Sequence, residues 1–370
     1  MLSLVTRQNL LAEKTRFAIS VGGIALSVFL ISFLLSLYQG WKLNVGRFVE
    51  RVEADVWVAR EGTSDFIAAA SILPNDMQGE LEALDGVRRV DPVVVRPMRF
   101  EETNANASTH LVGYDTESGV GGPVRWTKGK EVPGPGEAII DATYGRVAGV
   151  SMGDTLRFGG RELEVAGVST GGDFVFSQTT FVTLDEARSL LGMADLTTFY
   201  LVQLEDGADV DAFTSSVEDA FPGVVALTSD EFADTTRNRV MASVVPILIV
   251  ILFLAFVVGV AITGLTIYNA TVEKAREFGI LKAIGFTNGY LYRLVLEQSL
   301  VTGLLGFAIG VGLTVLGSRF ASDFVPQFVT LVRWQDLTLV LGATLLMSVI
   351  AALLPVRRIA GVDPVMVFNT

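Results

Sequence analysis

Four long apolar stretches constrain the fold of this chain more than any other feature of its sequence. They cover residues 17–38, 243–268, 294–316 and 337–354, and Glu297 is the only residue among Asp, Glu, Lys and Arg within them. A helix needs about 20 apolar residues to cross a hydrocarbon core, and a charge at the bilayer centre costs at least a few kcal/mol. The sequence therefore predicts an α-helical membrane protein with four transmembrane helices.

The first stretch follows basic residues, as the core of a secretory signal peptide does. It is longer than a usual signal core and ends without a small-x-small cleavage site, so we interpret it as an uncleaved anchor. Tyr38 and Trp41 lie at its end, where aromatic side chains favour the membrane interface. Residues 2–16 fit either a short amphipathic helix on the membrane surface or a plain extension of the anchor.

Basic residues in the short connecting segments predict the orientation. They are Arg7, Lys14, Arg16, Lys274, Arg276, Lys282, Arg293, Arg357 and Arg358, and only four acidic residues accompany them. The positive-inside rule places these segments, and both termini, in the cytoplasm. We therefore expect a multi-pass protein of the cytoplasmic (inner) membrane in which residues 41–240 lie on the outer side.

Residues 41–240 read as a self-contained acidic domain of mixed α and β structure. They hold 33 Asp and Glu against 17 Lys and Arg, which disfavours a nucleic-acid partner, and the chain has no cysteine. Alternating or β-branched segments predict strands at residues 54–58, 93–95, 138–140, 155–158, 163–168, 180–183 and 200–204, with helices at 75–84, 185–191 and 209–221. The turn at residues 133–136 is expected to divide the domain into two lobes.

The sequence contains no recognisable catalytic or nucleotide-binding motif. His110 is the only histidine, so His and Cys cannot assemble a zinc cluster, and we expect it on an exposed strand or loop. The nearest approach to a P-loop, Gly129-Lys130, continues with Glu131 instead of Ser or Thr. We expect no enzyme activity, no metal and no cofactor bound by this chain.

The loop at residues 269–293 is the most informative connecting segment. Polar residues surround an apolar stripe of Phe278, Ile280, Leu281 and Ile284, interrupted by small residues. Such a segment suits docking of a cytoplasmic partner or, equally, an interfacial loop that touches only lipid. In the third apolar stretch, a Gly306-x-x-x-Gly310 pair predicts close helix packing, either within one chain or in a dimer.

Residues 273–286, EKAREFGILKAIGF, resemble the coupling segment of FtsX/MacB-type ABC transporter permeases, which follows E-R-x-R-E-I-G-x-L-[KR]-A-[IL]-G. Residues 354–368 are similar to the closing segment of that family, P-x-R-R-A-A-x-x-x-P-x-x-A-L, although Val367-Phe368 replaces Ala-Leu. Residues 137–168 and 181–187 resemble its outer domain, in which a short helix follows the first strand. The resemblance covers nearly the whole chain.

The resemblance implies three regions: residues 1–40 with the first membrane helix, a MacB-like extracytoplasmic domain at 41–240, and an FtsX-like membrane domain at 241–370 with a coupling loop at 269–293 and a tail at 355–370. It implies a permease subunit that couples a separate ATPase, which binds ATP and magnesium, to movement of the outer domain. The implied cargo is a lipid, lipoprotein, peptide or drug. A signalling module of the same fold, acting on an extracytoplasmic partner such as a cell-wall hydrolase without transport, is the alternative.

The same resemblance implies the contact residues and partners. The expected ATPase contacts are Glu273, Arg276, Glu277, Gly279, Ile280, Leu281, Lys282, Ala283 and Gly285. A second cytoplasmic contact is expected at Arg357, Arg358, Asp363 and Pro364. The expected partners are an ABC ATPase, a second permease copy or paralogue in a dimer, an extracytoplasmic adaptor or substrate protein, and membrane lipids, but no nucleic acid.

Overall fold

A computed structural model of the chain divides it into two compact units. The structure describes residues 14–63, 65–68, 71–101, 103–104, 107–172, 178–325 and 328–360. The helical unit comprises the chain up to Gln39, Val245–Phe324 and the chain from Thr330 onward; the inserted domain comprises Gly40–Val244 and Val325–Val329. Each unit has its own hydrophobic core.

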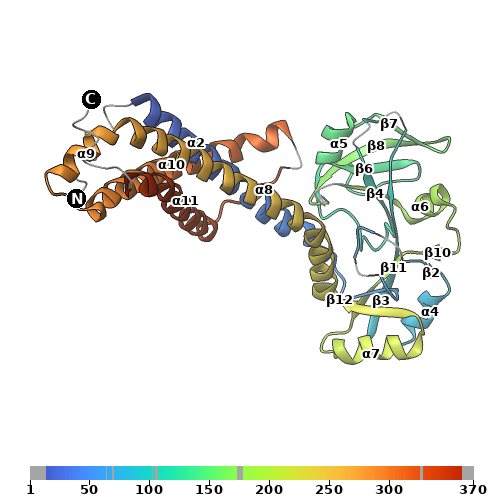
Figure 1. The fold of residues 1–370 in the computed structure, drawn as a ribbon. Helices are drawn as coiled ribbons and strands as arrows, with labels where there is room; N and C mark the ends of the chain where they lie inside the picture. Colours follow the sequence, from blue (N-terminus) through green and yellow to red (C-terminus); the bar gives the residue numbers. More distant parts are fainter. Residues whose placement is uncertain are drawn as a thin grey trace. The chain divides into compact units, whose positions relative to one another are not determined.

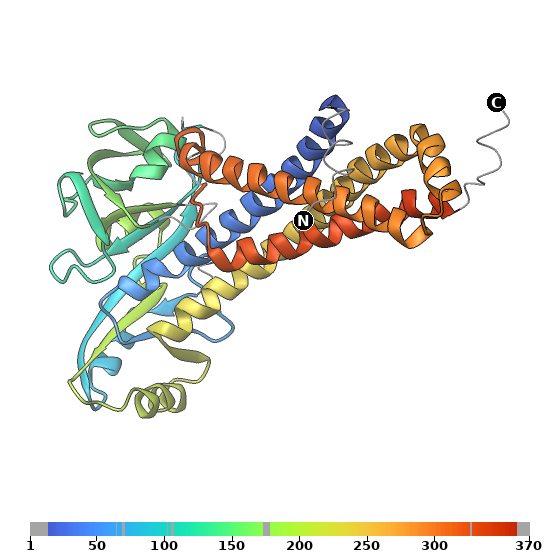
Figure 2. The ribbon, with the colours of Figure 1, turned by 90° about the vertical axis from the view of Figure 1, so that its left-hand side faces the viewer.

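Four long helices form the helical unit, as the apolar stretches predict. They are α2 (Lys14–Val45), α8 (Ser229–Glu273), α10 (Asn288–Phe324) and α11 (Trp334–Ala360). Each is long and apolar enough to cross a membrane, which confirms the predicted number and order of the spans. Figures 1 and 2 show their membrane segments packed lengthwise against one another.

The glycine pair of α10 packs against α2 of the same chain. A Cβ atom on Gly306 would lie 2.6 Å from Ile24 Cγ2, and one on Gly310 would lie 2.7 Å from the carbonyl oxygen of Ala25 and from Val28 Cβ. These contacts are too short for any side chain larger than hydrogen. The sequence left packing within the chain and packing in a dimer open; in the structure the pair makes a helix contact within the chain.

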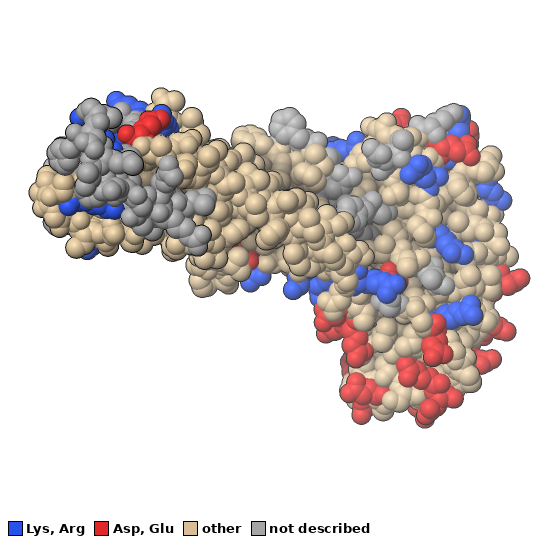
Figure 3. All heavy atoms as spheres, viewed as in Figure 1, with Lys and Arg blue, Asp and Glu red and all other residues tan. Residues whose placement is uncertain are grey.

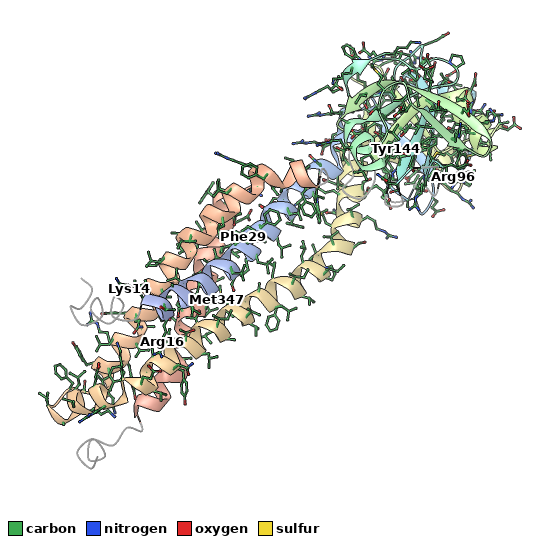
Figure 4. All side chains as sticks on the ribbon, turned by 90° about the horizontal axis from the view of Figure 1, so that it is seen from above. Lys14, Arg16, Phe29, Arg96, Tyr144 and Met347 are labelled. Atoms are coloured by element: carbon green, nitrogen blue, oxygen red, sulfur yellow. The ribbon has the colours of Figure 1, made fainter. Side chains whose placement is uncertain are left out.

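Several serines and threonines of the helical unit satisfy their hydroxyls within the bundle, whereas the buried hydroxyls of Ser32, Thr263 and Ser318 have no hydrogen-bond partner among the described residues. The Ser299 hydroxyl donates to the carbonyl oxygen of Ser348 across the α10–α11 contact at 2.6 Å, and the Thr314 hydroxyl donates to the carbonyl oxygen of Gly310 at 2.9 Å. Met347 of α11 is fully buried in this bundle (Figure 4). Lipid offers no hydrogen bonds, so internal pairing stabilises the hydroxyls that make it.

The inserted domain is a mixed α/β structure between the first and second membrane helices, as expected. Its strands are β1 (Val56–Arg60), β2 (Leu73–Pro74), β3 (Val87–Met98), β4 (Thr109–Tyr114), β5 (Arg125–Gly129), β6 (Glu137–Asp141), β7 (Thr155–Phe158), β8 (Arg161–Thr170), β9 (Gln178–Thr183), β10 (Leu196–Thr197), β11 (Phe199–Leu204) and β12 (Val224–Thr228). Its helices are α3 (Arg47–Arg51), α4 (Met77–Glu82), α5 (Ala142–Ala148), α6 (Leu184–Leu191) and α7 (Val210–Ala220). The main sheet has the order β12-β1-β11-β3-β4-β9-β6-β8-β5, and β7 pairs with β8.

The 12-residue strand β3 divides this sheet into two lobes. Its first part, up to Val93, pairs with β11, and its second part, from Val94, pairs with β4. The prediction of a lobe boundary at residues 133–136 is wrong, because that turn joins β5 and β6, which both pair with β8. A Pro/Gly turn reverses the chain locally, whereas the division follows from strand length and from the change of partner along β3.

An aromatic cluster forms the core between the sheet and the helices that enter and leave the domain. The Trp57 ring on β1 lies 5.0 Å from the Phe232 ring of α8 and 5.6 Å from the Phe199 ring of β11, centroid to centroid. Phe48 of α3 lies 5.0 Å from Phe66 in the same cluster. Aromatic pairs at these distances each add about 0.5–1.5 kcal/mol beyond the area that they bury.

His110 is buried on β4, which corrects the expectation of an exposed site. The side chain is 2% exposed, and its Nε2 lies 2.8 Å from the carbonyl oxygen of Ile67. Burial lowers the pKa of His110. Strand β4 was not among the predicted strands, although all six of its residues are buried between β3 and β9. Within the described residues, no group of three or more His, Cys, Asp or Glu could hold a metal ion.

Candidate functional site

Helix α9 (Ala275–Ala283) carries most of the predicted contact residues and lies between α8 and α10. It ends in a glycine cap. The Gly285 N–H donates to the carbonyl oxygen of Lys282 at 3.0 Å, and the Phe286 N–H donates to that of Leu281 at 3.0 Å. Gly285 adopts φ +103°, a conformation that side chains with a Cβ rarely adopt. This pair of bonds is the Schellman arrangement, and it explains why glycine stands at position 285.

One side of α9 is anchored in the helical unit. Phe278 is 8% exposed, and Leu281 packs beside it. Their neighbours in this cluster come from α8, α10 and α11 and include Ile267, Leu291, Leu294, Val295 and Ala352. Gly279 is buried on the same side of the segment. The anchored side therefore links α9 to three of the four long helices.

The opposite side of α9 is exposed and combines charges with apolar side chains. Arg276, Glu277 and Ala283 are exposed. Ile280 is 41% exposed and Ile284 is 70% exposed, one turn apart on the same face. The apolar stripe predicted from the sequence is therefore split: Phe278 and Leu281 point into the bundle, whereas Ile280 and Ile284 point away from it.

Glu273 holds the end of α8 against α2. Its carboxylate accepts two hydrogen bonds from the Arg16 guanidinium, one of them 2.6 Å long between Arg16 Nη2 and Glu273 Oε1. Figure 4 labels Arg16 near the start of α2. Bidentate pairing fixes the geometry of both side chains more strongly than a single ion contact does. Glu273 thus stands beside the exposed face of α9 and is already engaged within the chain.

The cavity between these helix ends has a volume of about 30 Å³. Its walls include Arg16, Ser20, Thr271, Gln298 and Phe278. A cavity of this volume has room for a small number of water molecules. The arrangement suits contact with a protein surface: an exposed short helix carries both charges and apolar groups, and its other side is packed into the bundle.

The structure describes only two of the four residues of the second predicted contact, which lies in the tail. Arg357 and Arg358 lie in the last turns of α11. Asp363 and Pro364 lie outside the described residues. The tail contact stays a prediction.

Two exposed residues of this face were absent from the predicted contact set. Ile284 is the more exposed of the two. Phe286, which follows the glycine cap, is 41% exposed, and its ring centroid lies 4.7 Å from that of Tyr290 with the ring planes tilted by 33°. The spacing of four residues between Ile280 and Ile284 was the sequence signal that could have identified Ile284 as a contact residue. Arg16 was also missed, because no local pattern connects it with a residue 257 positions away.

Comparisons with known proteins match both units. The FtsX-like permease C-terminal domain family matches residues 249–364, and the MacB-like periplasmic core domain family matches residues 17–220. The uncharacterized ABC transporter permease Rv2563 of Mycobacterium tuberculosis is 24% identical over 366 residues, 96% of each chain. The uncharacterized ABC transporter permease YknZ of Bacillus subtilis is 22% identical, again over 96% of each chain.

A putative hemin transport system permease protein, HrtB of Staphylococcus haemolyticus, is 23% identical over 58% of this chain and 59% of its own length. Among solved structures, the periplasmic region of MacB from Actinobacillus actinomycetemcomitans is similar to 51% of this chain, over 96% of its own length, with a TM-score of 0.38 and 14% identity. The extracellular domain of YknZ is similar to 47% of this chain, over 99% of its own length, with a TM-score of 0.35 and 16% identity.

Proposed function

The chain belongs to the FtsX/MacB family of ABC transporter permeases, and we propose that the exposed face of α9 (Arg276, Glu277, Ile280 and Ile284) contacts a separate ATPase subunit. The observation that carries this proposal is the split of α9 into an anchored and an exposed side. An isoleucine that is 70% exposed is costly in water and gains free energy when a partner covers it.

The anchored side of α9 connects a contact on its exposed side to the long helices. A displacement of α9 moves Phe278 and Leu281, which pack against α8, α10 and α11. The Arg16–Glu273 pair extends the same connection to α2. ATP-driven closure of the ATPase then shifts the long helices between two packed arrangements, because closely packed helices move as rigid bodies.

We further propose that this permease acts as a dimer in the cytoplasmic membrane, with α9 and both termini in the cytoplasm, and that the inserted domain handles a lipid, lipoprotein, peptide or drug outside it. The ATPase partner binds ATP and magnesium and supplies the chemistry. Basic residues in the short segments beside α9 support the orientation. The family membership supports the transport role.

The test is co-purification of a candidate ABC ATPase subunit from the same organism, and its stimulated turnover, with full-length chains in lipid nanodiscs. Covering the exposed 70% of Ile284 contributes about 1–2 kcal/mol, so Ile284→Asp should weaken binding by about 5- to 30-fold or more. Glu277→Lys should change the association rate. Met152→Asp, at an apolar residue of the inserted domain that is 53% exposed, is the matched control.

Gly285 allows a second comparison. A Cβ atom there meets nothing within 4 Å among the described residues, so Gly285→Ala tests only the strain of φ +103°. Gly285→Trp adds bulk towards the partner. A difference in ATPase binding between the two variants supports docking at this position. Wild-type binding and stimulation in Ile284→Asp, Glu277→Lys and Gly285→Trp together would mean that α9 touches only lipid.

A further inference from the structure

The inserted domain contains a cavity of about 250 Å³ that three arginines line. Its walls are formed by Asn44, Arg47, Arg51, Arg125, Asp141, Thr143, Thr170, Gly171 and Val329. This volume is several times that of a water molecule and admits a small polar group. No sequence motif predicted this cavity, and it takes no part in the proposed contact with the ATPase.

Local structure brings the arginines together. Asn44, Arg47 and Arg51 follow one another at spacings of three and four residues, which places them on one face of a helical segment. Asn44 Oδ1 accepts a hydrogen bond of 2.9 Å from Arg47 Nη1 and so orients that guanidinium. Arg125 reaches the same cavity from the edge strand β5, where it pairs with Thr170 of β8.

Some arginines of the domain have a carboxylate partner and others, including the exposed Arg88, have none among the described residues. Arg89, Arg157 and Arg237 each form an ion pair with a carboxylate. Within the part of the chain that the structure describes, Arg47, Arg51 and Arg125 form none. On the face drawn in Figure 3, carboxylates gather over the end of the domain that carries α7.

Asp141 is the one carboxylate among the described residues of the cavity wall, and backbone groups already hold it. Its Oδ1 accepts from the Thr143 N–H at 2.7 Å, and its Oδ2 accepts from the Gly172 N–H at 3.3 Å. The side chain is 1% exposed, and burial raises its pKa. Asp141 therefore shapes the wall without neutralising three guanidinium groups.

We propose that this cavity binds a phosphate group, either on a phospholipid headgroup or as a free phosphate ion. Guanidinium groups match phosphate oxygens with paired N–H donors, and several of them at one place give selectivity for phosphate over single-charge anions. The position in the chain favours the headgroup: Asn44 follows Trp41, the interfacial residue at the end of the first apolar stretch, by three residues. This inference is independent of the ATPase contact.

The test uses the full-length chain in detergent, titrated with phosphatidylglycerol and followed by native mass spectrometry. A basic residue beside a membrane contributes about fivefold to the binding of an anionic lipid. Arg47→Ala and Arg125→Ala should each weaken binding about fivefold, and the double variant about 25-fold. Arg88→Ala, at an exposed arginine of β3 outside the cavity, is the matched control and should bind as the wild type does.

A second arm separates the two sources of phosphate. Inorganic phosphate is added to lipid-depleted protein, and the melting temperature is measured. Stabilisation of the wild type and not of the double variant identifies a free-phosphate site; lipid binding without that stabilisation identifies a headgroup site. The Arg47→Lys/Arg125→Lys variant, which keeps both charges, should retain part of the binding and controls for folding. If the double variant binds both ligands as tightly as the wild type, the proposal is wrong.

Discussion

Replacing Gly310 with alanine should destabilise the helical unit, whereas the same replacement at Gly312, two residues along the same helix, should not. A Cβ atom at Gly310 would lie 2.7 Å from the carbonyl oxygen of Ala25 and 2.7 Å from Val28 Cβ. A Cβ atom at Gly312 meets nothing within 4 Å in the part of the chain that the structure describes. The two variants thus share their gain in helix propensity and differ only in what the added methyl group touches.

The size of the destabilisation caused by Gly310→Ala follows from these distances. Carbon atoms pack at about 3.5–4.0 Å, so the methyl group at Gly310 forces α2 and α10 apart by about 1 Å. The atom in the way is a backbone oxygen of α2, which cannot rotate aside as a side chain can. Such overpacking costs about 1–3 kcal/mol, which lowers the folded-to-unfolded ratio of Gly310→Ala by about 5- to 150-fold relative to Gly312→Ala.

The assay is unfolding of the purified full-length chain in mild detergent, by titration with a denaturing detergent and by thermal melting, with the oligomeric state measured in parallel. Equal stability of the two alanine variants would refute the α2–α10 contact at this register. A change in oligomeric state at unchanged stability of the single chain would instead place the Gly306–Gly310 pair in a dimer interface.

Three further outcomes are expected. Cysteines introduced at the exposed positions Glu117 and Asn288 should react differently with an impermeant thiol reagent on intact cells; labelling of Asn288 alone would reverse the proposed topology. Residues 42–240, expressed alone, should give a soluble domain with mixed α/β circular dichroism and a cooperative melt; a product that folds only in lipid would contradict a self-contained core. Because burial lowers the pKa of His110 below 6.5, the unfolded chain binds a proton that the folded chain does not, so stability is full above about pH 6.5 and falls as pH drops toward the folded pKa. The stability difference between the wild type and His110→Gln, both without a histidine tag, should show this dependence between pH 7.5 and 5, and a constant difference would contradict it.

The sequence by itself determined the features that depend on local patterns. Apolar length gave the four membrane helices, and alternation gave seven strands of the inserted domain. The segment at residues 273–286 was also recognisable from its sequence, whereas the role of Gly285 as a helix cap is a finding of the structure. The acidic charge of the inserted domain followed from counting its Asp, Glu, Lys and Arg residues.

Tertiary structure alone decided which of these elements meet. It turned Phe278 inward and Ile284 outward from one apolar stripe, buried His110 between β3 and β9, and brought Arg16 to Glu273. It also gathered arginines from α3 and β5 around one cavity. Hydrophobic periodicity reports how a segment faces its nearest layer, but a partner far away in the sequence leaves no period in it, so such contacts emerge only when the elements pack.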